Sequence, residues 1–165
     1  MDVADRRARA MAEISDRTGI TEAMIETLVR GFYDRVRADG LLGPIFQARI
    51  ADWEPHLQRM CAFWSSVTLM SGSYHGQPMA KHLSLPIDAR HFDRWLWLFA
   101  QTAGELCPPA AADYFVERAN VIAQSLELGV AGSAGFFLDK GERLMRPDDD
   151  VFLPGAVDFW MDESA

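Results

Sequence analysis

The chain has 165 residues and a formal net charge of −8, a length that fits one domain with its own core and excludes two ordinary domains with a linker. The excess of acidic residues provides no positive surface for nucleic acid or an anionic membrane, so we expect neither as a partner. No apolar run approaches the roughly 20 residues that cross a bilayer, and the amino end is polar, which together predict a cytoplasmic protein.

The first helix that we predict lies between Thr21 and Asp39, where Thr21 is a suitable N-cap residue. Its apolar positions recur every three or four residues, as on one face of a helix, at Ile25, Leu28, Phe32 and Val36. Segment 41–46 contains glycine and proline and is expected to form a tight apolar corner. A second helix is expected to begin near Asp52.

The second helix carries an apolar stripe over 53–70, and His56 lies on that stripe. Two glycines, two serines and a proline predict a loop over 71–78. His82 follows this loop directly, in the segment Lys81-His82-Leu83.

Two further helices are predicted after Pro86. Apolar residues recur at helical spacing over 92–106, and a last helix is expected from about 110 to 128. None of these segments alternates strictly between apolar and polar residues, so we predict an all-α fold. The two cysteines lack zinc-site spacing and are expected to stay as buried or half-buried thiols, at Cys61 and Cys107.

The carboxyl-terminal segment after Gly129 differs in composition from the predicted helices. It contains several glycines and the acidic run 148–150, but also aromatic residues such as Phe159 and Trp160. This segment is too apolar for a fully solvated tail. We expect it to pack back on the domain or to bind a partner.

Four residues with polar ends lie on the apolar faces of these helices: Tyr33, His56, His82 and Trp95. A buried tyrosine hydroxyl or indole N–H needs a hydrogen-bond acceptor, so their joint occurrence near histidines indicates a pocket that holds one. A neutral imidazole such as that of His82 is also a suitable ligand for haem iron. Taken singly, each of the four is more typical of an ordinary core or surface position.

A series of short segments follows in a characteristic order at 32–39, 42–46, 53–57, 63–66, 74–78, 81–86 and 95–99. This series resembles the truncated globins, and within them the third group. The resemblance implies a truncated globin domain over 20–129, with an amino-terminal extension at 1–19 and a carboxyl-terminal extension at 130–165.

The resemblance also implies a helical sandwich around one haem b, whose iron is held on the proximal side by His82. Tyr33 and Trp95 would then form a polar distal pocket, and His56 would gate ligand entry. His91 is a competing proximal ligand, but His82 keeps the Lys-His-Leu setting of the family.

Other residues are expected around the haem. Lys81 and Tyr74 would lie near the propionates, although a solvated lysine and a loop tyrosine are equally consistent with the sequence. Several apolar side chains would be walls or core that bury the porphyrin, with Phe46, Phe63 and Leu85 among them.

On the proximal side, we expect the second ring nitrogen of His82 to bind a backbone carbonyl of the preceding loop. No carboxylate is evident nearby in the sequence. This favours gas binding over strong activation of peroxide.

The resemblance implies a protein that binds dioxygen, carbon monoxide or nitric oxide, for oxygen transport or for turnover of nitric oxide or peroxide. Whether it is an enzyme stays open. The chain lacks a Gly-x-Gly-x-x-Gly motif after a strand, so turnover would require an external reductase. The alternative is a haem-linked sensor or protein-interaction module that uses the carboxyl-terminal tail.

Overall fold

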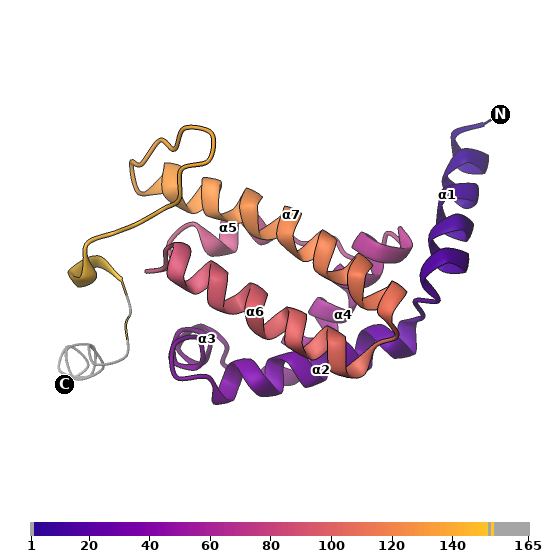
Figure 1. Cartoon of the computed structure of the whole chain (residues 1–165), viewed down its shortest axis with the longest axis horizontal. Helices are drawn as coiled ribbons and strands as arrows, with labels where there is room; N and C mark the ends of the chain where they lie inside the picture. The colour runs from indigo at the N-terminus through magenta and orange to yellow at the C-terminus, as the bar shows by residue number, and fades with distance from the viewer. Residues whose placement is uncertain (1, 152, 154–165) are drawn as a thin grey trace.

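The computed structural model describes residues 2–151 and 153. Helices connected by short loops make up most of this part, which contains no strand (Figure 1). The all-α prediction is therefore confirmed. The helices are α1 Val3–Thr18, α2 Glu22–Ala38, α3 Gly43–Arg49, α4 Trp53–Leu69, α5 Pro78–His82, α6 Ala89–Leu106 and α7 Pro109–Ser133, followed by a 3-10 turn, η1, at Asp148–Asp150.

The ends of the first two helices follow directly from the sequence. Gly19 adopts a left-handed conformation with φ of 69° and ends α1, a backbone angle that glycine accepts without a steric penalty. The Thr21 side chain accepts a hydrogen bond from the Met24 N–H at 3.1 Å. Thr21 is thus the N-cap of α2, as predicted.

The core lies where α2, α4, α6 and α7 meet. Phe32, Phe99 and Phe115 are each at most 1% exposed. The Phe32 and Phe99 rings pack edge to face with centroids 5.2 Å apart, and Trp64 stacks on Phe99 at 4.9 Å. These aromatic contacts fix the positions of the helices around the site described below.

Segment 41–46 is not a simple corner, because it contains the start of α3. Proline is tolerated in the first turn of a helix, where its missing N–H has no intrahelical partner. A Cβ atom at Gly43 would lie 2.7 Å from the carbonyl oxygen of Arg37. Glycine is therefore needed here because α3 begins in direct contact with the end of α2.

Two other expectations on helices need correction. Residues 3–18, for which no helix was predicted, form α1, which extends away from the body of the protein (Figure 1). The last helix continues to Ser133 rather than 128. The loop predicted over 71–78 is confirmed up to Gln77, and Cys61 and Cys107 are half-buried and buried thiols, as expected.

The described part of the carboxyl-terminal segment packs back on the domain. Leu144 is fully buried and Val151 is 1% exposed. Phe159 and Trp160, which were expected to pack on the domain or to bind a partner, lie outside the described residues. No helix in the described ranges is long and apolar enough to span a membrane.

Candidate functional site

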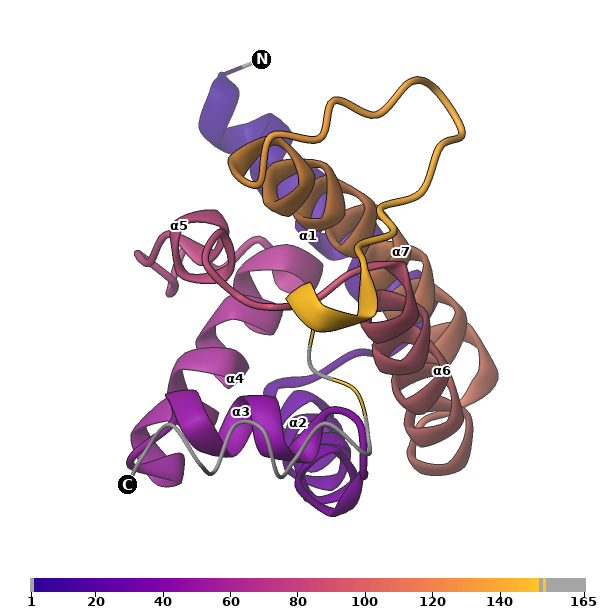
Figure 2. The ribbon, with the colours of Figure 1, turned by 90° about the vertical axis from the view of Figure 1, so that its left-hand side faces the viewer.

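A cavity of about 730 Å³ lies between α2, α3 and α4 on one side and α5 and α6 on the other. Figure 2 shows these helices arranged around a common centre. The volume is in the range of small-molecule and cofactor sites. All nine residues that the sequence proposed for the site line this cavity: Tyr33, Phe46, His56, Phe63, Tyr74, Lys81, His82, Leu85 and Trp95.

His82 is the last residue of α5 and has a defined tautomer. Its Nδ1 atom lies 2.6 Å from the carbonyl oxygen of Pro78. Because a carbonyl only accepts hydrogen bonds, Nδ1 carries the proton and donates it. The lone pair then resides on Nε2, which is the form of imidazole that binds a metal. The expected backbone partner is thus present, one helical turn before His82.

Tyr33 and His56 lie together in the same cavity. Their rings meet edge to face with centroids 5.2 Å apart. Burial, and to a smaller extent the neighbouring Cys61, raises the pKa of Tyr33, so its hydroxyl stays protonated and remains a donor. His56 Nε2 is buried, yet no atom of the described residues forms a hydrogen bond with it. An unsatisfied buried nitrogen is costly, which indicates that a ligand in the cavity supplies its partner.

Trp95 links the cavity to the core. Its ring stacks on Phe99 with centroids 5.4 Å apart and meets Phe32 edge to face at 5.4 Å. These two contacts hold the indole rigidly, while the residue also lines the cavity. A rigid donor loses little conformational entropy when it binds a ligand.

Cationic side chains contribute to the lining from both sides of the cavity. Lys81 was proposed from the sequence, whereas Arg49 and Arg59 were not. Arg49 donates to the hydroxyl of Ser84 at 3.4 Å and to its carbonyl oxygen at 3.3 Å. No local pattern could reveal this contact, because Arg49 and Ser84 are distant in sequence. Cations at these positions suit a ligand that carries carboxylates.

His91 also lines the cavity, but it has a structural role in α6. Its Nδ1 accepts a hydrogen bond from the Asp88 N–H at 3.1 Å, while Asp88 caps the helix in return. If His91 bound a metal, it would have to do so while keeping these reciprocal hydrogen bonds with Asp88 at the start of α6. His82 has no such cap to maintain.

No group of three or more histidine, cysteine or carboxylate side chains could hold a metal ion within the described ranges. A metal at His82 would need its remaining ligands from another source. Haem supplies four nitrogens from its own ring and needs a protein ligand on only one side. The cavity volume, its aromatic lining and a histidine whose Nδ1 proton is bound to a backbone carbonyl therefore fit haem.

The sequence also missed the contribution of α7. Ala123 and Leu126 line the cavity next to Ile87 and Phe92 of the α6 region. Leu126 lies within the predicted last helix, but helical spacing does not distinguish a core position from a cavity wall.

The structure predicts a pH effect at His56. Burial, followed by the charges of Arg59, Lys81 and His82, lowers its pKa from 6.5 to about 4. Between these values the unfolded chain binds a proton at His56 that the folded chain does not. The free energy of unfolding must then decrease as the pH falls from 6.5 towards 4. We expect His56→Gln to flatten this dependence, measured as the thermal midpoint against pH.

A direct measurement of the same pKa is a histidine titration followed by NMR, with the His56 resonances assigned through the variant. Titration of His56 close to 6.5 would contradict the burial seen in the structure.

Comparison with known proteins identifies related sequences and folds. A family model of bacterial-like globins matches residues 13–118. The group 3 truncated hemoglobin ctb of Campylobacter jejuni is 34% identical over 113 residues, which cover 66% of this chain and 89% of that protein. The group 2 truncated hemoglobin YjbI of Bacillus subtilis is 32% identical over 79 residues, or 47% of this chain and 60% of that protein.

Solved structures with a similar fold are also hemoglobins. The crystal structure of group III truncated hemoglobin from Campylobacter jejuni aligns with a TM-score of 0.63 at 30% identity, covering 74% of this chain and 96% of that one. The hemoglobin of Chloroflexus aurantiacus aligns with a TM-score of 0.57 at 25% identity, covering 68% and 95%. About a quarter of this chain thus has no counterpart in the Campylobacter structure.

Proposed function

This chain belongs to the bacterial-like globin family as a group III truncated haemoglobin, and we propose that it binds dioxygen and other diatomic gases at a haem b held by His82. The family implies haem as the cofactor. The residues assigned to it, the choice of ligands and the distal roles below are our proposal.

The observation that carries this proposal is the pairing of two features in one cavity. His82 has its Nδ1 proton bound to Pro78 at 2.6 Å, which leaves Nε2 as a metal ligand. His56 Nε2 is buried in the same cavity without a hydrogen-bond partner in the described chain. One side of the cavity is thus prepared for a metal and the other for a polar ligand.

When bound, haem supplies an iron with an open coordination position for a small ligand. The protein contributes the surroundings of that position. Tyr33 and Trp95 would donate hydrogen bonds to the ligand, because the Tyr33 hydroxyl stays protonated and the Trp95 ring is fixed by Phe99. Phe46 and Phe63 would exclude water from the ring faces.

The partner of His82 favours gas binding over peroxide chemistry. A carboxylate bound to Nδ1 would give the imidazole anionic character and promote cleavage of an oxygen–oxygen bond. Here the partner is the neutral carbonyl of Pro78. We therefore propose reversible ligand binding as the main activity, with nitric oxide or peroxide turnover as a secondary one that requires an external reductase.

We expect the purified protein to bind haemin in a one-to-one ratio. Its reduced form should show a Soret band that shifts when carbon monoxide is added. Absorption titration with haemin, followed by reduction and exposure to carbon monoxide, measures both properties. A spectrum identical to that of free haemin would contradict the proposal.

A further inference from the structure

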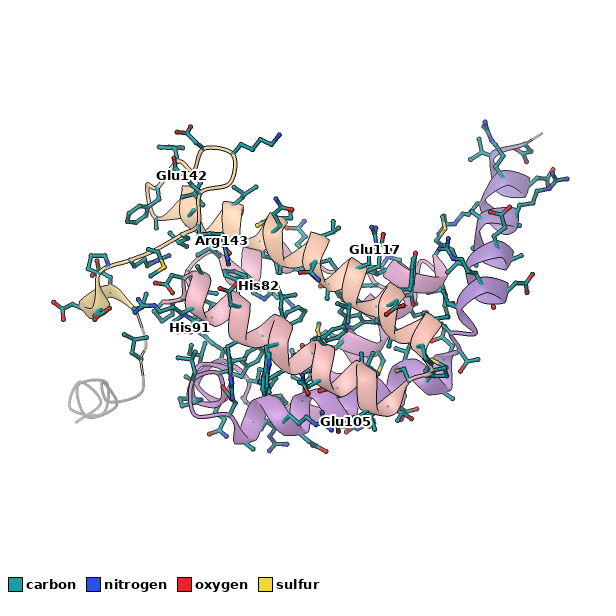
Figure 3. All side chains as sticks on the ribbon, in the orientation of Figure 1. His82, His91, Glu105, Glu117, Glu142 and Arg143 are labelled. Carbon is teal, nitrogen blue, oxygen red and sulfur yellow. The ribbon has the colours of Figure 1, made fainter. Side chains whose placement is uncertain are left out.

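The segment after α7 returns to the domain at the end where α5, α6 and α7 meet. Residues 139–151, here called the strap, run from the loop beyond α7 to η1 (Figures 1 and 2). Figure 3 shows Arg143 of the strap at the same end of the molecule as His82 and His91, whereas Glu105 and Glu117 lie towards the opposite end. The strap therefore lies on the His82 side of the protein.

One side chain of the strap packs in an apolar cluster that includes residues of the cavity wall. Leu144 is fully buried in an apolar cluster with Ile87, Phe92 and Ala123. These three partners line the cavity themselves. Leu144 thus packs in the same cluster as the proximal wall, and its loss would leave a void in that cluster.

A buried carboxylate on α7 holds this part of the strap. Glu127 is 6% exposed. It accepts hydrogen bonds from Arg143 Nε at 2.9 Å and Nη2 at 2.8 Å, and from the Leu144 N–H at 3.0 Å. Arg143 Nη2 also lies 2.7 Å from Asp93 of α6. Arg143 therefore connects α6 and α7 through the strap.

A second buried carboxylate, at the start of α6, holds the next residues of the strap. Asp88 is fully buried and accepts a hydrogen bond from the Arg146 N–H at 3.2 Å. The adjacent Ala89 N–H donates to the Leu144 carbonyl oxygen at 2.8 Å. Arg90 extends the contact to Asp148 of η1 at 3.0 Å.

These two carboxylates indicate that the domain is built to receive the strap. Without Arg143 and the Leu144 amide, Glu127 would be an unpaired buried charge, which is strongly destabilising. The strap nevertheless lies outside residues 13–118, which the globin family model matches.

We propose that the strap closes the proximal side of the cavity and determines how firmly haem is retained, with Arg143 as the positioning residue. This inference rests on the proposed haem function. The strap acts on His82 through the segment 83–89, whose far end it holds at Asp88 and Ala89. Release of the strap would loosen both this segment and the wall formed by Ile87 and Phe92.

The test uses Arg143→Ala in the full-length haem-loaded protein. We expect haem transfer to excess apomyoglobin to be about tenfold faster than in the wild type, since loss of Arg143 leaves the buried Glu127 carboxylate without its ion-pair partner and releases the strap. The iron–histidine stretching band of the reduced protein, recorded by resonance Raman spectroscopy, should broaden or shift. A purely structural ion pair would not change this band.

The matched control is Arg35→Ala. Arg35 of α2 pairs with Glu105 of α6 at 2.5 Å, away from the strap. This variant should retain the wild-type rate of haem loss and the wild-type band. A second variant, Glu127→Gln on α7, keeps an acceptor for the Leu144 N–H and removes only the charge. It should accelerate haem loss less than Arg143→Ala, and it decides the question if Arg143→Ala does not fold.

The outcomes separate the two proposals. Wild-type haem loss and an unchanged band in both Arg143→Ala and Glu127→Gln would overturn the role of the strap alone. Wild-type protein that does not bind haem would overturn the proposed function and the role of the strap together.

Discussion

His82→Ala should abolish the proximal attachment of haem. His82 is the cavity histidine whose Nδ1 proton is bound to a backbone carbonyl, at 2.6 Å from Pro78. With Nε2 removed, the iron loses its protein ligand, and we expect haem affinity to fall at least about a hundredfold, or about 2.7 kcal/mol. The Soret band of the reduced carbon monoxide form, compared between wild type and variant, measures this loss.

Two further samples make this experiment specific. Added imidazole should restore a haem spectrum in His82→Ala, because the cavity left by the side chain can hold a free ligand. The control His75→Ala removes an exposed histidine of the 70–77 loop and should leave the spectrum unchanged.

His91 provides the competing outcome. It lines the same cavity, but its Nδ1 accepts the Asp88 N–H at 3.1 Å in the cap of α6. If His82→Ala retained haem with wild-type affinity and spectrum, His91 would become the proximal candidate and our assignment of His82 would be wrong.

The sequence predicted the helices that bear the site because their signals are local. The apolar stripe of α2 and the N-cap Thr21 lie within one segment, and the same holds for α4 and α6. Helix α3 was missed because Gly43 and Pro44 are typical of a turn. The close contact of α3 with the end of α2, at the Arg37 carbonyl, is a tertiary contact that the local pattern does not contain.

The order of the motifs led to nine proposed site residues, and in the structure these nine line one cavity. The sequence did not predict the side chains that reach the cavity from distant segments. Leu126 of α7 and Arg49 of α3 reach the cavity through tertiary packing that no spacing encodes. The strap shows this most clearly. Arg143 pairs with Glu127 of α7 and with Asp93 of α6, and no local sequence pattern predicts either contact.

Tyr33→Phe and Trp95→Phe should each accelerate the release of dioxygen. Bound dioxygen carries partial negative charge on its oxygen atoms, and each neutral hydrogen bond to it contributes about 0.5–1.5 kcal/mol. Burial keeps the Tyr33 hydroxyl protonated and available as a donor. Each variant should therefore release dioxygen a few times to about tenfold faster, and the double variant about tenfold to a hundredfold faster. Stopped-flow displacement of dioxygen measures these rates.

Carbon monoxide provides the internal control for this experiment. It carries less negative charge than dioxygen when bound, so loss of a donor should change its release much less. Phenylalanine preserves the aromatic packing of Trp95 against Phe99 and of Tyr33 against Phe46, so the core should remain intact. Equal acceleration for both gases would mean that the variants opened an exit path. Acceleration of dioxygen release alone would mean that Tyr33 and Trp95 act as hydrogen-bond donors, which is the role that their polar ends on apolar helix faces predict.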